Sequence, residues 1–261
     1  MVTLKTTALR RPLLAVAAVG LAWHALLFSF DALLPGLALT WFVDLGALVV
    51  NLLAAAAVVY VLWRWGWLRA SGVTTLGRVD RWWIVLPFLA ATGFTLSGGL
   101  EGTTTELIGS LVMLVLGVGL SEEIYSRALS LQIANRLAPL IACAWVGLVF
   151  GAGHFLSALY FGRDLEGAAG QVLFAGLSGF VLCAVRIAIH TIWPLVLVHG
   201  FDDWAILNSP TEPADWWLVS TGLASIAYAV WLLRRYGHEF AESKPAAPSH
   251  RTREHRPAVP A

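Results

Sequence analysis

Eight long apolar runs restrict the folds that this chain can adopt. A helix needs about 20 predominantly apolar residues to cross a bilayer, because each residue adds about 1.5 Å to its length. The chain is 58% hydrophobic and 13% charged, whereas soluble domains carry roughly 25% charged residues. We therefore expect an all-α fold, a polytopic membrane helical bundle with about eight transmembrane helices. The expected spans are Pro12–Phe30, Trp41–Trp63, Trp82–Leu100, Glu106–Asn135, Ala138–Phe161, Ala168–Ile189, Ile192–Leu207 and Trp216–Tyr236.

The two ends of the chain call for different interpretations. Residues 5–30 begin with basic residues and continue into an apolar run, as a signal peptide does, but no convincing small-residue cleavage site follows. We therefore expect a retained first span. After residue 237 the sequence becomes polar and rich in proline. Residues 1–237 are thus predicted to form the transmembrane bundle, and residues 238–261 a disordered cytoplasmic tail.

The distribution of basic residues predicts the orientation of the bundle. With eight spans and the N-terminus inside, every Lys and Arg except Arg163 falls on the inner side, if the Arg127 within the fourth span is counted there. Loops that stay in the cytoplasm collect Lys and Arg, so we expect both termini to be cytoplasmic, in a bacterial plasma membrane. The net charge of +1 gives no reason to expect a nucleic-acid partner, and membrane lipid is the expected surrounding.

Three charged residues lie within the fourth apolar run, in the sequence LGVGLSEEIYSRALSL. A charged side chain at the centre of a spanning helix costs ~2.5–3.5 kcal/mol on insertion scales, so it faces a protein interior or a watery cavity. Glu123 and Arg127 are four residues apart and share a helix face. We expect them to form a structural ion pair, which leaves Glu122 available for chemistry. The alternative is a packing salt bridge beside one interfacial glutamate.

Two histidines form further polar clusters in other spans. His154 lies in GAGHF, where Gly151 and Gly153 allow a neighbouring helix to approach closely. His199 and Asp203, in HGFDD, are four residues apart and share a face. The alternatives are that His154 makes a hydrogen bond between helices and that His199 and Asp203 satisfy each other.

Helix lengths place Glu122, His154 and His199 at a similar middle depth. A glutamate, two histidines and an aspartate from three helices can supply a base for water, a partner for that water and donors to an oxyanion. The neighbouring Asp202 points off the shared face, and we interpret it as structural or interfacial. The isolated His24 and Asn51 are expected to make hydrogen bonds between helices.

The order of these motifs resembles the CPBP family of intramembrane proteases, which contains CAAX prenyl endopeptidases and bacteriocin-processing proteins. The motifs read EEIYSR (residues 122–127), FGAGH (150–154) and HGFDD (199–203), within a motif-bearing core of residues 106–207. The resemblance implies an intramembrane endopeptidase whose substrate is a membrane-associated or prenylated peptide or protein. It implies that Glu122 activates water together with His154. His199 and Asp203 would bind the oxyanion, and Glu123 and Arg127 would support the site.

The sequence departs from the family pattern at Asp203, where the prenyl endopeptidases commonly carry Asn. An ionised carboxylate only accepts hydrogen bonds, whereas an amide also donates them. Asp203 could be protonated, could orient His199, or could help to hold a metal. The family is usually described as metalloproteases, and a divalent metal such as zinc would take Glu122, His154, His199 and Asp203 as its ligands. We favour a metal-free mechanism slightly, because Glu122 must stay free to take a proton.

Two other classes of function remain open at the level of sequence. One is a non-catalytic membrane immunity or scaffold protein that binds peptides in the same cavity. The other is an ion-coupled or proton-coupled transporter, because membrane carboxylates and histidines also form relays. The lack of an evident inverted repeat in the sequence weakens the transporter hypothesis.

Overall fold

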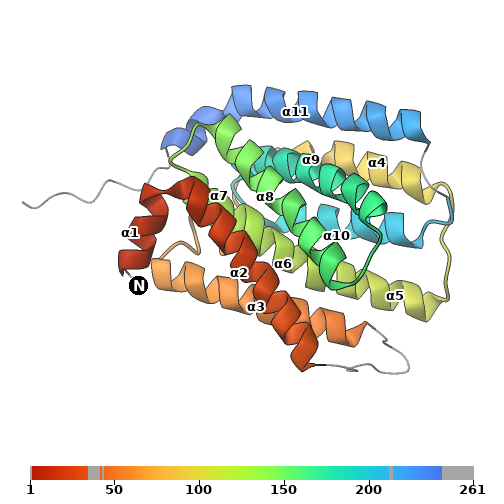
Figure 1. The fold of residues 1–261 in the computed structure, drawn as a ribbon. Coiled ribbons are helices and arrows are strands. Elements are labelled where there is room, and N and C mark those ends of the chain that lie inside the picture. Colours follow the sequence, from red (N-terminus) through yellow and green to blue (C-terminus); the bar gives the residue numbers. More distant parts are fainter. Residues whose placement is uncertain (1, 35–41, 43, 212–213, 243–261) are drawn as a thin grey trace, which may run out of the picture.

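The computed structural model describes residues 2–34, 42, 44–211 and 214–242. Within these residues the fold is all-α, as predicted, and the long helices lie side by side with α2 and α8 crossing the others obliquely (Figure 1). The α-helices are α1 (Val2–Arg10), α2 (Pro12–Leu33), α3 (Leu45–Trp65), α4 (Leu86–Leu96), α5 (Thr104–Val112), α6 (Leu120–Glu123), α7 (Leu131–Ala134), α8 (Pro139–Tyr160), α9 (Leu165–Ile189), α10 (Trp193–Asn208) and α11 (Asp215–Glu242). A 3₁₀ segment, η1 (Val79–Val85), precedes α4.

Six helices of the described chain are long and apolar enough to cross a membrane. They cover Pro12–Leu33, Leu45–Trp65, Thr104–Ala134, Pro139–Tyr160, Glu166–Ile189 and Trp216–Phe240. The other two predicted spans correspond to α4, with 11 residues, and α10, with 16 residues. At 1.5 Å per residue α10 is about 24 Å long, shorter than a hydrocarbon core of about 30 Å. The protein is thus an integral membrane bundle in which α4 and α10 are short.

The predicted fourth span is one continuous helix that contains two π-helical segments. Between α5 and α7 the segments η2 (Met113–Gly119) and η3 (Ile124–Ser130) are π-helical and flank the four residues of α6. The backbone N–H of Leu131 bonds to the carbonyl of Ser126, five residues back. A capping box between Thr103 and Glu106 begins the helix. Because π-helical turns are uncommon and frequent at functional sites, they mark α6 as the place to look for chemistry.

Helices α8 and α9 pack closely because glycines line their contact. A Cβ atom at Gly151 would lie 2.5 Å from the carbonyl oxygen of Val172, and one at Gly147 would lie 2.6 Å from the backbone nitrogen of Phe180. Real side chains never approach backbone so closely. The contact therefore requires glycine, as in other membrane helix pairs that use small residues. This close packing fixes the position of α8, which carries His154.

Helix α11 extends beyond the predicted end of the bundle. It continues to Glu242, whereas the sequence predicted a disordered tail from residue 238 onward. That boundary was wrong for residues 238–242, because Phe240 is buried in the main core and Glu239 lies 2.9 Å from Arg81 in an ion pair. Residues 243–261 lie outside the described residues, so the remainder of the predicted tail stays a prediction.

Candidate active site

The two adjacent glutamates of α6 have different environments. Arg127 Nη1 lies 3.1 Å from Glu123 Oε1, and both side chains are fully buried. Arg127 also bonds to Ser126 Oγ at 2.5 Å and lies over the ring of Phe150. The predicted contact is therefore present although the helix is π-wound from Ile124 onward. Glu122 points elsewhere and keeps a side-chain exposure of 13%.

His199 on α10 lies at the centre of the carboxylates. Its Nδ1 is 2.8 Å from Glu123 Oε1, and its Nε2 is 3.5 Å from Glu122 Oε2 and 3.6 Å from Asp203 Oδ2. Because an ionised carboxylate only accepts, Nδ1 carries the proton that it donates to Glu123. The other nitrogen of the ring thus faces Glu122 and Asp203.

Small residues allow α10 to approach the acidic pair so closely. A Cβ atom at Gly200 would lie 2.5 Å from the Cα of Val115, and one at Gly119 would lie 2.9 Å from the carbonyl oxygen of Val196. Gly200, which follows His199, and Gly119, which lies three residues before Glu122, therefore leave no room for a side chain. Replacing either would push α10 away from the helix that carries the glutamates.

His154 lies near this cluster but is not joined to it. Its Nδ1 donates to the carbonyl of Phe150 at 3.1 Å, which leaves Nε2 free to accept a proton. The ring of Phe150 neighbours both histidines, with centroid separations of 5.1 Å to His154 and 6.2 Å to His199. In the part of the chain that the structure describes, no ion pair or hydrogen bond joins His154 to Glu122, His199 or Asp203.

The remaining polar residues have mainly structural contacts. Asp202 accepts a hydrogen bond from Thr92 Oγ1 at 2.7 Å and so ties α10 to α4. Asn51 accepts a bond from Ser121 Oγ on α6 at 2.6 Å, the bond between helices that the sequence predicted. The prediction for His24 was wrong. Its Nδ1 bonds to the carbonyl of Gly20 in its own helix, and its ring fills the space beside Gly153.

Sequence reasoning missed two features of the site. It treated Glu123 as a partner of Arg127 alone, although Glu123 also holds His199. It also gave His24 no place near the site, although the Gly153 that accommodates its ring precedes His154 directly. The signal for the second feature was present in the sequence, because a glycine beside a motif histidine leaves room for a large side chain from another helix.

The described side chains, as placed, do not converge on a metal centre. Zinc would require its nitrogen and oxygen ligands to converge at about 2.0–2.2 Å. Among the described residues, no group of three or more His, Cys, Asp and Glu side chains is arranged to hold a metal ion. Nδ1 of His199 is bonded to Glu123, and His154 lies apart from the carboxylates.

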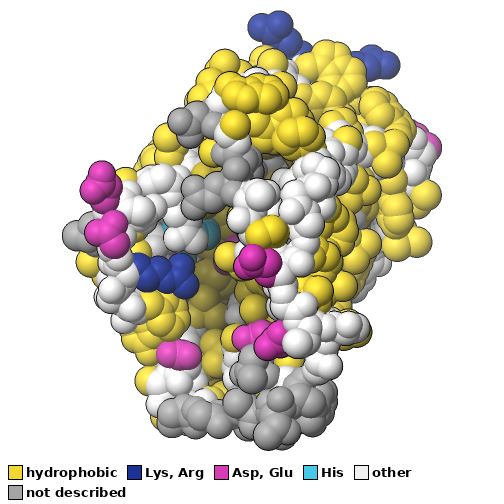
Figure 2. Space-filling model, turned by 90° about the vertical axis from the view of Figure 1, so that its right-hand side faces the viewer, with side chains coloured by type: hydrophobic (Ala, Val, Ile, Leu, Met, Phe, Trp, Pro, Cys, Tyr) yellow, Lys and Arg dark blue, Asp and Glu magenta, His cyan; other side chains and the backbone are white. Residues whose placement is uncertain are grey.

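A hollow at one end of the molecule exposes buried polar groups. Figure 2 shows this end, with a histidine side chain visible inside, hydrophobic side chains along the walls, and acidic side chains and a basic one around the rim. The side chains of His199 and Asp203 retain 10% and 31% exposure. Water can therefore reach polar groups in the interior of the bundle.

The fold and this cluster define an integral membrane helical bundle with carboxylates and histidines held between its helices. A family model described as Rce1-like, type II CAAX prenyl endopeptidase, matches residues 104–205. That segment contains all three sequence motifs, so the resemblance to the CPBP family is confirmed. Through this segment, which is about two fifths of the chain, the protein is similar to CAAX-type intramembrane proteases. No curated protein and no solved structure matches the chain significantly.

Proposed function

We propose that this protein is an intramembrane endopeptidase in which Glu122 activates the attacking water. The observation that carries the proposal is the unequal environment of the two glutamates. Glu123 is held by Arg127 and His199, whereas the one ion pair of Glu122 among the described residues is with His199 across 3.5 Å, and its side chain is partly exposed. Glu122 makes no short ion pair of the kind that Arg127 makes with Glu123, so among the two glutamates it is the one placed to take a proton from water.

The reaction follows from the donors and acceptors of the cluster. Glu122 takes a proton from water, and the resulting hydroxide attacks the carbonyl carbon of the scissile bond. The oxyanion that forms accepts a hydrogen bond from Nε2–H of a protonated His199, whose Nδ1–H is donated to Glu123. Glu122 then passes its proton to the departing amine, and the C–N bond breaks. His154, with Nε2 free, helps to hold the water.

The proposed substrate is a prenylated or otherwise membrane-associated peptide or protein. The description of the matching family supports this class. The hydrophobic walls of the hollow in Figure 2 suit an apolar peptide better than a charged one.

The test compares two glutamate variants in one assay with a prenylated peptide reporter. Removing a general base lowers turnover by roughly 10²–10⁴-fold, so Glu122→Gln is expected to abolish cleavage while the protein still inserts and folds. Glu101→Gln changes an exposed loop glutamate in the same way and is expected to cleave normally. Because the natural substrate is undefined, cells carrying each variant are also compared by proteomics for an accumulating uncleaved peptide.

Two outcomes would contradict this proposal. Unchanged turnover by Glu122→Gln would remove Glu122 from the mechanism. A protective effect in cells that survives both Glu122→Gln and His154→Ala would favour the alternative of a non-catalytic immunity or scaffold protein.

We also propose that both termini face the cytoplasm. The support is the gathering of Arg69, Arg78 and Arg186 with Phe240 of α11 around one pocket at one end of the bundle, because cytoplasmic loops collect basic residues. In this orientation the hollow of Figure 2 opens away from the cytoplasm. A single cysteine introduced at Arg78 should react with a membrane-impermeant reagent only after the membrane is opened, and labelling in intact cells would reverse the orientation.

A further inference from the structure

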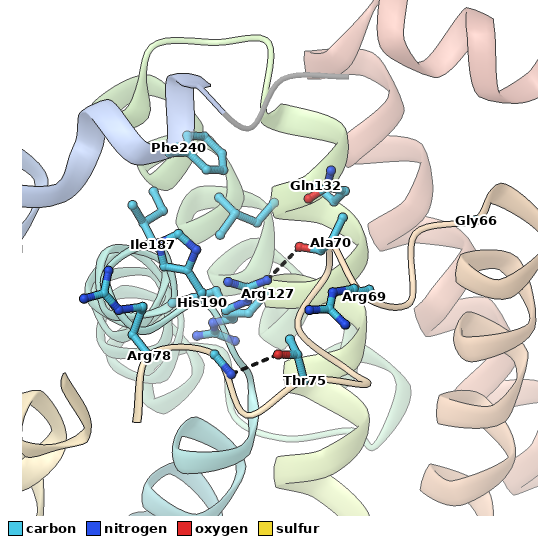
Figure 3. Close-up of a pocket in the computed structure, with 13 residues that line it drawn as sticks. Gly66, Arg69, Ala70, Thr75, Arg78, Arg127, Gln132, Ile187, His190 and Phe240 are labelled. Carbon is cyan, nitrogen blue, oxygen red and sulfur yellow. Dashed lines mark hydrogen bonds between the residues drawn. The ribbon is translucent and has the colours of Figure 1, made fainter. Parts of the chain in front are cut away.

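A cavity lined by arginines lies at the basic end of the bundle, away from the hollow. Its volume is about 560 Å³. Four arginines and a histidine line it: Arg69, Arg78, Arg127, Arg186 and His190. In the close-up Arg69 and Arg78 approach from opposite sides, with Arg127 and His190 between them (Figure 3). These side chains come from the α3–α4 connection, from η3 and from the end of α9, so the fold brings them together from distant parts of the sequence.

The positive charge of this arginine pocket is not balanced by residues in its wall. No acidic residue is among the described residues that line it. Three of the lining cations have carboxylate partners outside the lining, because Arg78 pairs with Asp80, Arg127 with Glu123 and His190 with Glu239. Among the residues that the structure describes, no ion pair occupies the side chains of Arg69 and Arg186. Within the described chain, no hydrogen bond or ion pair involves the side chain of Arg69, whose backbone carbonyl accepts from the N–H of Gly72. A cavity with several cations and no anion favours an anionic ligand.

Arg127 supplies the strongest reason to infer a ligand. Its side chain is buried and lines the pocket, yet its Nε and Nη2 have no hydrogen-bond partner within the described structure. Nη1 alone is used by Glu123 and Ser126. Leaving buried guanidinium donors unsatisfied is costly, and an anion in the pocket would satisfy them.

Arg186 shows that the pocket is a built feature of the fold. This side chain is also buried, and its Nε and Nη2 donate to the carbonyls of Ser71 and Ala70 at 3.2 and 3.0 Å. Gly72 is required beside it, because a Cβ atom there would lie 2.7 Å from Arg186 Nη2 and its φ is +82°. The loop of residues 70–72 is thereby held against the guanidinium group of Arg186, and Ala70 forms part of the pocket wall.

We propose that this pocket binds a phosphate group, carried by a phospholipid headgroup or free in solution. Guanidinium groups bind phosphate oxygens through paired N–H donors, and several from different directions suit a tetrahedral anion. The volume exceeds that of a single carboxylate and accommodates a phosphate with its substituent. The same guanidinium of Arg127 faces the phosphate on one side and Glu123 on the other, so the ligand would adjoin the group that orients His199.

The test measures phosphate binding to the full chain purified in a detergent free of phosphate. The melting temperature is followed during titration with inorganic phosphate, with chloride or acetate at matched ionic strength as the comparison. Phosphate is expected to raise the melting temperature of the wild type. Arg69→Gln and Arg127→Lys should each weaken the apparent affinity by about tenfold, the loss of one charged hydrogen bond. Arg136→Gln, an exposed arginine outside the pocket, serves as the matched control and should bind normally.

A second measurement distinguishes the two sources of the phosphate. Protein taken from bilayers of phosphatidylglycerol is analysed by native mass spectrometry with and without added phosphate. Retained lipid that phosphate displaces, and that Arg69→Gln loses, indicates the headgroup; a phosphate shift without retained lipid indicates free phosphate. The proposal is overturned if neither lipid nor phosphate binds, if acetate binds as well as phosphate, or if all variants bind equally. None of these readouts depends on proteolysis, so failure here leaves the proposed function untouched.

Discussion

Glu123 on α6 holds Nδ1 of His199 on α10 at 2.8 Å, and the same oxygen contacts Arg127 at 3.1 Å. One carboxylate therefore joins two helices and fixes the ring whose other nitrogen faces Glu122. This contact makes Glu123 a positioning residue for the proposed reaction, acting through His199.

Glu123→Gln is expected to lower kcat far more than it changes KM, because the substrate still binds while His199 loses its orientation and its stabilising anion. It should also destabilise the fold by ~3–5 kcal/mol, because Arg127 becomes a buried cation without its partner. Enzyme kinetics and thermal unfolding check the two effects. The double variant Glu123→Leu with Arg127→Leu removes the unpaired charge, so it should recover stability and still lack activity. Recovery of activity in that double variant would exclude the positioning role.

Asp203→Asn separates the metal-free mechanism from a metal-dependent one. In a metal-free site the amide keeps the shape of Asp203 and adds donors near His199 Nε2, so substantial activity should remain. In a metal site the change removes a ligand, and activity should fall together with bound metal. Activity and metal content are measured before and after chelation. Loss of wild-type activity on chelation, its return with stoichiometric zinc and an inactive Asp203→Asn would together establish a metal enzyme.

The sequence predicted those parts of the site that depend on spacing along one helix. Glu123 and Arg127 are four residues apart, and His199 and Asp203 are four apart, so both contacts could be anticipated. The bond from His199 to Glu123 could not, because it depends on how far α10 slides and rotates against α6. The π-helical turns around α6 also escaped prediction, since they differ from an α-helix in hydrogen bonding and not in composition.

The presence of the helices could be predicted from the sequence, but their lengths could not. Apolar runs fix the existence of the helices but not how much of each run is helical, so the runs at residues 82–100 and 192–207 were read as full spans. In the structure the first of them begins with the 3₁₀ segment η1, and α4 ends before the glycines at 98 and 99. The tail boundary failed because the burial of Phe240 depends on packing against other helices.

Gly151→Ala tests whether the contact between α8 and α9 holds the site together. The added methyl group would meet the carbonyl oxygen of Val172 at 2.5 Å, so the helices must separate. Overpacking of this kind costs ~1–3 kcal/mol, and the resulting shift of α8 should displace His154 and reduce turnover. Gly170→Ala on α9 is the matched control, because its Cβ would meet nothing within 4 Å. Equal melting temperatures for the two variants would show that α8 and α9 can separate at Gly151 without loss of stability.

We expect the stability of the protein to depend on pH through His190 at the basic end of the bundle. Burial lowers the pKa of His190, and Arg186 acts in the same direction, while Glu239 at 2.8 Å partly opposes them. The net pKa is below the ordinary value of 6.5, so the unfolded chain takes up a proton at a higher pH than the folded protein does. Stability from this group is therefore present above about pH 6.5 and is lost as the pH falls through that value toward the lower pKa of the folded state.

His190 adopts φ 61°, which Asn tolerates better than most residues, so His190→Asn removes the titration without straining the turn. The melting temperature of the wild type should fall between pH 7.5 and 5.5, and that of His190→Asn should fall less over the same interval. Parallel curves for the two proteins would assign the pH dependence to other groups.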